Sequence, residues 1–201
     1  MDAARYFAVL VVVVMFPPGF AAWFFIHPFI NFWRRVGPGL TLGIWLSVLL
    51  SLCYGLFNVR SSLLAVDYGT QWILVGIGVV LYMSGTVVEI RCRRYLTLRT
   101  LMGIPELKAT DEEPGKLLNA GIYAQVRHPR YLGVMLGGIG IACIANYQTA
   151  WVIMAALVPV TYLLTVVEER ELRDRFGEQY TRYAEKVPRI IPVLGSRNRI
   201  V

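Results

Sequence analysis

Charged residues are scarce in this sequence. Asp, Glu, Lys and Arg make up 16% of its 201 residues, and its mean hydropathy is +0.54. A soluble domain carries charge at about a quarter of its positions. The apolar residues, 56% of the chain, also come in long runs, which is typical of helices that cross a bilayer. The composition excludes an ordinary soluble domain and predicts an all-α integral membrane protein, with residues 1–201 forming a single polytopic domain.

Cysteine and histidine are also rare. The three cysteines cannot all pair, and Cys53 and Cys143 lie inside apolar runs while Cys92 lies in a basic segment. No disulfide framework is therefore implied, and we expect all three to act as small buried hydrophobic residues. We predict no metal site.

Acidic residues are fewer than basic ones, which gives a formal net charge of +7. Eight of the 20 Lys and Arg residues fall in residues 91–130 and eight in residues 168–201. Both basic regions flank apolar runs, so the predicted partner is an anionic membrane surface. A nucleic acid partner is not expected from this distribution.

The apolar runs predict about five transmembrane helices. The first run includes Pro17, Pro18 and Gly19, which we expect to kink or break its helix. It continues to Trp33, so we interpret it as a retained span rather than a signal peptide. Only Tyr147 and Gln148 mark the junction of the last two runs, which predicts a tight antiparallel hairpin. The expected spans are residues 5–31, 39–59, 70–90, 131–147 and 149–167.

The charges between the runs predict the orientation. Basic residues follow the first, third and fifth runs, whereas the second connection offers only Arg60 against Asp67, and the last turn is uncharged. The positive-inside rule then predicts an external N-terminus and a cytoplasmic C-terminus.

Two polar segments fall on the predicted cytoplasmic side. Residues 95–120 form a loop punctuated by proline and glycine. Residues 168–187 are predicted to be helical, with one apolar stripe and a division at Gly177. An amphipathic helix lying on the bilayer is the alternative interpretation. The stripe consists of Leu172, Phe176, Tyr180, Tyr183 and Val187.

The segment "GIYAQVRHPRYLG" places polar side chains directly before the fourth span. Pro129 disfavours helical backbone at His128 and suits the first turn of a helix. Arg127 and His128 are thus expected at the positive end of a helix dipole, where free N–H groups suit an anionic group of a ligand. Tyr131, about one turn further, can stack on a flat ring or donate its hydroxyl. The alternative is an interfacial belt of Arg, His and Tyr, the role we assign to His27.

Glu168 and Glu169 directly follow the fifth span. Carboxylates are costly to bury there, and they are either solvated or paired with Arg170 or Arg173. In a pocket, two adjacent acids would hold a cation or bind ribose hydroxyls.

Taken together, "GIYAQVRHPRYLG", "EEREL", "FGEQYTRY" and "VPRIIP" resemble the isoprenylcysteine carboxyl methyltransferase family. More broadly they are similar to the membrane methyltransferases that include phospholipid N-methyltransferases. The resemblance covers residues 119–192, in order and with the right spacing.

The resemblance implies an S-adenosylmethionine site built by the last two spans and the C-terminal helices. Arg189, before the final Ile-Pro, is implied to orient the polar head of the substrate, and Glu168 is the second candidate catalytic residue. Gly76 and Gly78 match a cofactor-binding Gly-x-Gly of the phospholipid-methylating relatives, although packing between helices is the alternative role. The implied cofactor contacts are Tyr123, Arg127, His128, Tyr131, Glu168, Glu169, Tyr180 and Tyr183.

These patterns lead to one functional hypothesis and two alternatives. The hypothesis is an S-adenosylmethionine-dependent methyltransferase of a lipidic or prenylated substrate, by carboxyl O-methylation or lipid N-methylation. Residues 1–90 would supply three spans and residues 91–201 the cofactor-binding region, with the 95–120 loop and the C-terminal helices as a lid. The alternatives are an NADPH-dependent membrane sterol-type reductase, which shares a similar C-terminal pattern, and a non-catalytic membrane protein.

Overall fold

The computed structural model describes residues 2–26, 29–95 and 117–192. His27 and most of the 95–120 loop, with its expected roles, lie outside these residues. Within them, apart from one isolated bridge between Asp67 and Tyr147, the regular structure is helical. The elements are α1 (Asp2–Ile26), α2 (Ile30–Val36), α3 (Pro38–Asn58), α4 (Arg60–Leu63), α5 (Trp72–Arg93), the 3₁₀ turn η2 (Gly121–Ala124), α8 (Pro129–Ala145), α9 (Gln148–Phe176) and α10 (Glu178–Lys186).

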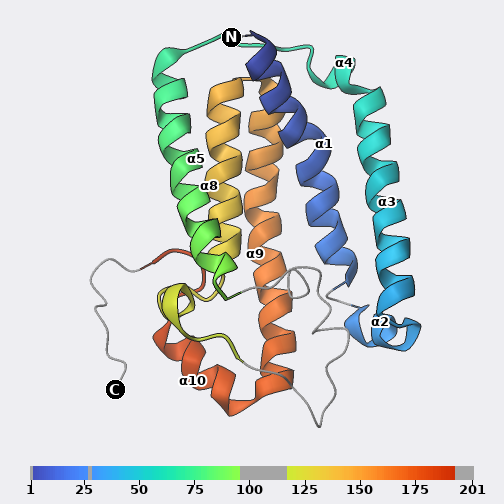
Figure 1. Cartoon of the computed structure of the whole chain (residues 1–201), viewed down its shortest axis with the longest axis vertical. Helices are drawn as coiled ribbons and strands as arrows, with labels where there is room; N and C mark the ends of the chain where they lie inside the picture. The colour runs from blue at the N-terminus through green and yellow to red at the C-terminus, as the bar shows by residue number, and fades with distance from the viewer. Residues whose placement is uncertain (1, 27–28, 96–116, 193–201) are drawn as a thin grey trace.

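The long helices stand side by side as one bundle (Figure 1). Four of them, α1, α3, α5 and α9, are long and apolar enough to cross a membrane. The expected fourth span is α8, which has 17 residues and so a length of about 26 Å. The prediction of an all-α integral membrane protein is confirmed, with α8 shorter than the other spans.

Glycines bring α5 and α8 into close contact. A Cβ added to Gly78 would stand 2.6 Å from the carbonyl oxygen of Gly140, and one added to Gly85 would stand 2.6 Å from that of Gly133. Gly78 therefore serves helix packing, the alternative role that the sequence offered. It lies toward the start of α5, while the polar cluster described below gathers beyond the other end of that helix.

Pro17 and Pro18 lie inside α1, which continues to Ile26, so the pair does not break the helix. Prolines are tolerated within membrane helices because neighbouring groups and local adjustments satisfy the backbone atoms that they leave unpaired.

The segment after the fifth run is not a separate helix. Residues 168–176 extend α9 without interruption, because they contain no Pro or Gly and are mostly good helix formers. The expected division at Gly177 is present: this residue has φ +54°, and α10 begins after it. Glu168 and Glu169 thus lie within a continuous helix that leads out of the bundle.

One end of the bundle is held together around Arg5, which is only 2% exposed. Its guanidinium forms an ion pair with Asp67, and its Nε donates to the carbonyl oxygen of Ala145 at 3.0 Å. It also lies 5.4 Å from the ring centroid of Tyr147. These contacts join the start of α1, the connection before α5 and the α8–α9 turn, all at the top of Figure 1.

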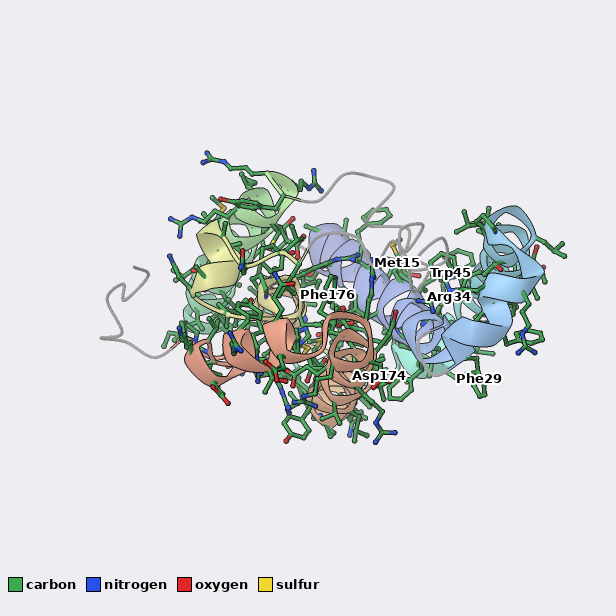
Figure 2. All side chains as sticks on the ribbon, turned by 90° about the horizontal axis from the view of Figure 1, so that it is seen from below. Met15, Phe29, Arg34, Trp45, Asp174 and Phe176 are labelled. Carbon is green, nitrogen blue, oxygen red and sulfur yellow. The ribbon has the colours of Figure 1, made fainter. Side chains whose placement is uncertain are left out.

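The opposite end carries α2, η2, α10 and the last turns of α9. Figure 2 shows it from below, with α2 beside the last turns of α9, where Asp174 and Phe176 are labelled. Arg34 of α2 reaches Glu171 of α9, with its Nη2 3.8 Å from Oε1. This ion pair fixes α2 to the extended part of α9.

Candidate active site

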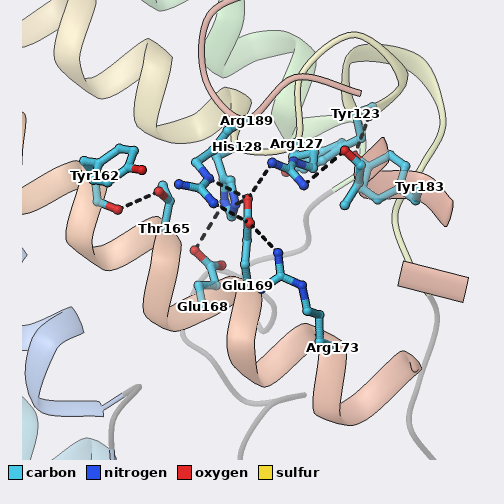
Figure 3. Close-up of polar contacts among 11 residues, drawn as sticks. Tyr123, Arg127, His128, Tyr162, Thr165, Glu168, Glu169, Arg173, Tyr183 and Arg189 are labelled. Atoms are coloured by element: carbon cyan, nitrogen blue, oxygen red, sulfur yellow. Dashed lines mark hydrogen bonds and ion pairs between the residues drawn. The ribbon is translucent and has the colours of Figure 1, made fainter. Parts of the chain in front are cut away.

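The site is built around Glu169, whose side chain is completely buried (Figure 3). Arg189 binds it through two parallel hydrogen bonds, Nε to Oε1 and Nη2 to Oε2, both 2.9 Å. Arg127 Nη2 lies 3.1 Å from Oε1, and Arg173, one turn further along α9, lies 3.4 Å from Oε2. A buried carboxylate is tolerated only with such charge-assisted partners. Glu169 is therefore neither solvated nor held by Arg173 alone.

His128 lies between the two glutamates. Its Nε2 is 3.2 Å from Glu169 Oε1 and its Nδ1 is 3.4 Å from Glu168 Oε2. Burial alone would lower the pKa of His128, but the hydrogen bonds and negative charges of the two carboxylates outweigh it and raise the pKa above the usual value. With an acceptor at each nitrogen, the imidazolium form fits this position.

The backbone holds the two halves of the site together. The N–H groups of Arg127 and His128 donate to the carbonyl oxygens of Pro188 and Arg189, both at 2.9 Å. His128 caps α8 and Pro129 occupies its first turn, as the sequence predicts. The N–H groups of Arg127 and His128 are not free for a ligand, however, because the segment after α10 uses them.

Arg189 also contacts a residue nearer the centre of the bundle. Its Cζ lies 5.1 Å from the ring centroid of Tyr162, which belongs to α9 and is 55% exposed. Hydrogen bonds with Glu169 raise the pKa of Arg189, and desolvation opposes this shift. The guanidinium thus joins the buried carboxylate to an exposed aromatic ring.

Tyrosines from three segments surround the ionic cluster. The hydroxyl of Tyr183 donates to the carbonyl oxygen of Tyr123 at 2.6 Å, which links α10 to η2. The rings of Tyr180 and Tyr183 are 5.9 Å apart, as are those of His128 and Tyr131. Burial raises the pKa values of Tyr123, Tyr180 and Tyr183, so all three remain neutral donors.

Two buried hydrogen-bond donors in this cluster have no partner within the described part of the chain. They are the hydroxyl of Tyr180, a residue only 1% exposed, and Nε of Arg127. Unpaired buried donors are costly and rare. They are available for a ligand with anionic or hydroxyl oxygens.

All the residues predicted for the site come together at this end of the bundle. Arg127, His128, Glu168, Glu169 and Arg189 form one network of ion pairs (Figure 3). The four tyrosines lie beside this network, linked to it or to one another by ring contacts and a hydrogen bond. Their individual roles remain predictions.

Sequence reasoning missed Tyr162 and Glu89. Tyr162 precedes Glu169 by seven residues, so the two share a face of α9, a spacing that could have identified it. Glu89 lies in α5, and its Oε1 is buried without a hydrogen-bond partner in the described segments. A Cβ on Gly133 would stand 2.9 Å from that oxygen, so Glu89 lies directly against α8.

The fold and the site together define a helical, polytopic membrane protein with a buried ionic cluster at one end of its bundle. The family model described as phospholipid methyltransferase matches residues 73–179, slightly more than half of the chain. The protein belongs to this family. The resemblance drawn from its motifs is thereby confirmed.

The individual proteins that resemble this chain are 25–33% identical to it over the matched residues. Protein-S-isoprenylcysteine O-methyltransferase B of Arabidopsis thaliana is 33% identical over 94 residues, which is 43% of this chain and 44% of that protein. A probable protein-S-isoprenylcysteine O-methyltransferase of Oryza sativa subsp. indica is 25% identical over 145 residues, 68% of this chain and 71% of that protein. Methanethiol S-methyltransferase 1 of Bradyrhizobium diazoefficiens is 32% identical over 88 residues, 43% of this chain and 30% of that protein. No solved structure matches the chain.

Proposed function

We propose that the protein is an integral membrane methyltransferase that uses S-adenosylmethionine and acts on a lipidic or prenylated acceptor. The observation that carries the proposal is the cluster of Arg127, His128, Glu168, Glu169 and Arg189 at one end of the bundle. Membership of the phospholipid methyltransferase family supports it, as do the names of the similar proteins.

The residues present fit this cofactor. S-adenosylmethionine supplies a methyl group activated on a sulfonium, and it also carries a carboxylate, an ammonium, a ribose and an adenine. Arg127 Nε and the Tyr180 hydroxyl are donors without a partner among the described residues, and they suit carboxylate or hydroxyl oxygens. Glu168, with its side chain 27% exposed, suits the ammonium or the ribose. The rings of Tyr123, Tyr131 and Tyr183 suit the adenine, and His128 and Glu169 hold the other groups in place.

Arg189 would orient the acceptor. Its guanidinium is fixed by Glu169 on one edge and remains 25% exposed, so it can bind an anionic head group. Transfer to an ionised carboxylate needs positioning and the exclusion of water but no general base. An amine would first lose a proton, for which the partly exposed Glu168 is the candidate base.

The arrangement in the membrane follows from charge. We infer that the N-terminus is external and that the C-terminus and the site are cytoplasmic, because basic residues gather at the site end. Residues 91–201 would form the cofactor-binding region and residues 1–90 three supporting spans. The cofactor would enter from the cytoplasm and the acceptor from the bilayer.

The test is binding followed by transfer. S-adenosylhomocysteine, but not NADPH, is expected to raise the Tm of the purified protein in detergent, and His128→Ala and Glu168→Gln are expected to abolish this shift. Labelled methyl from S-adenosylmethionine should then appear in a host lipid extract, with mass analysis of the product. A shift with NADPH alone would overturn the proposal in favour of a reductase. Unchanged cofactor affinity in both variants would contradict the assigned site.

A further inference from the structure

Tyr162 lies on the same face of α9 as Glu169, two turns closer to the middle of the bundle. The Arg189 guanidinium occupies the space between them: its Nε and Nη2 edge binds Glu169, and its Cζ faces the Tyr162 ring at 5.1 Å. Figure 3 shows the three side chains in this order along α9. A ring within about 6 Å of a guanidinium attracts it. Arg189 is therefore held from two sides.

The outer face of Tyr162 is open. It is 55% exposed, like its neighbour Leu163 at 52% and Val158 at 55%. In a helix that crosses a bilayer, this surface faces hydrocarbon. Tyr162 thus lies at the boundary between the lipid and the ionic cluster. Its aromatic ring suits the lipid, and its hydroxyl suits the ionic cluster.

We propose that Tyr162 is a positioning residue for the methyl acceptor: it holds Arg189 toward the bilayer and forms the side of the acceptor site along which a hydrocarbon chain leaves. The inference rests on the proposed function and deepens it. It specifies an acceptor whose anionic head meets Arg189 while its apolar tail lies against the Tyr162 ring. Such an acceptor reaches the cluster sideways along α9 rather than through the end of the bundle.

N-acetyl-S-farnesylcysteine, a carboxylate with one hydrocarbon chain, is the probe. Its binding to the detergent-solubilised protein with S-adenosylhomocysteine present is measured by calorimetry, and its methylation gives separate KM values for probe and cofactor. Tyr162→Ala is expected to weaken probe binding and raise the probe KM about three- to fivefold, the size of an exposed cation–π contact plus lost ring packing. The KM for S-adenosylmethionine should not change.

Two variants separate positioning from general damage. Tyr162→Phe retains the ring but loses the hydroxyl that interacts with Arg189, so its probe KM should lie between those of wild type and Tyr162→Ala. Leu163→Ala removes a similarly exposed apolar side chain next to Tyr162 in the sequence and should have no effect. The methyl ester of the probe has no anion but keeps the hydrocarbon chain, so wild type should bind it weakly and Tyr162→Ala should weaken this binding by less than it weakens binding of the acid.

Each opposing result has one meaning. Equal losses in Tyr162→Ala and Leu163→Ala, a cofactor KM that rises together with the probe KM, or no binding of the probe by wild type would overturn the role of Tyr162. Failure of wild type to bind S-adenosylhomocysteine would instead overturn the proposed function.

Discussion

At the residue scale, two tyrosines of α10 differ in whether their hydroxyl is paired. The Tyr183 hydroxyl bonds to Tyr123, so Tyr183→Phe is expected to cost about 1 kcal/mol of stability and lower the Tm of the free protein. The Tyr180 hydroxyl is unpaired within the described residues, so Tyr180→Phe should leave that Tm unchanged or slightly higher. If this hydroxyl binds the cofactor, Tyr180→Phe should still weaken S-adenosylhomocysteine binding about tenfold.

These two measurements are made on the same preparations, with thermal unfolding first and calorimetry second. A Tm loss in Tyr180→Phe without any loss of ligand affinity would mean that the hydroxyl is structural.

His128 provides a pH test at the same scale. Its pKa is raised in the folded protein, against about 6.5 for an unperturbed histidine. The charged ring therefore stabilises the fold fully below about pH 6.5, and this contribution is lost as the pH rises through the folded value. The Tm difference between wild type and His128→Gln should be largest near pH 6 and shrink toward pH 9. A difference that grows with pH would contradict the ion pairs with Glu168 and Glu169.

At the element scale, α5 and α8 depend on glycines for their close approach. A Cβ at Gly85 would meet only backbone atoms of α8, at 2.6 to 3.2 Å, and backbone cannot rotate away. Gly85→Ala should therefore destabilise the protein by about 1–3 kcal/mol. Gly76 is the matched control, because nothing lies within 4 Å of its added Cβ, and alanine there should favour the helix. Equal Tm values for the two variants would mean that the helices separate more easily than this packing implies.

The sequence predicted the positions of some helices closely and missed the length of others. Apolar runs located α3, α5 and α8 to within a few residues, because burial in lipid demands such runs. The continuous α9 was not predicted, since a change from apolar to charged residues marks a membrane boundary but does not end a helix. Likewise Pro17 and Pro18 lie within α1, where surrounding contacts outweigh the tendency of proline to interrupt a helix.

The sequence predicted which residues form the site but not how they contact one another. Motif order gave Arg127, His128, Glu169 and Arg189, yet nothing in it shows that all three cations converge on one carboxylate. Tyr162 was missed because a lipid-facing tyrosine is ordinary in sequence and acquires meaning only from the guanidinium beside it.

At the scale of the whole molecule, the Arg5 cluster and the ionic site occupy opposite ends of the bundle (Figure 1). Arg5→Met would leave Asp67 and the Ala145 carbonyl oxygen without this partner, at a cost of about 1–3 kcal/mol. We expect a lower Tm with unchanged S-adenosylhomocysteine affinity, because the described site residues lie at the other end of the bundle. A parallel loss of affinity would show that the two ends are coupled.

The four cations around Glu169 determine how ligand binding should respond to ionic strength. A ligand carboxylate that enters this cluster meets cations that are already paired with a buried carboxylate and partly enclosed, instead of an open basic surface. Mobile ions screen such enclosed charges poorly. Raising potassium chloride should thus weaken attachment to anionic vesicles well before it weakens occupancy of the cluster.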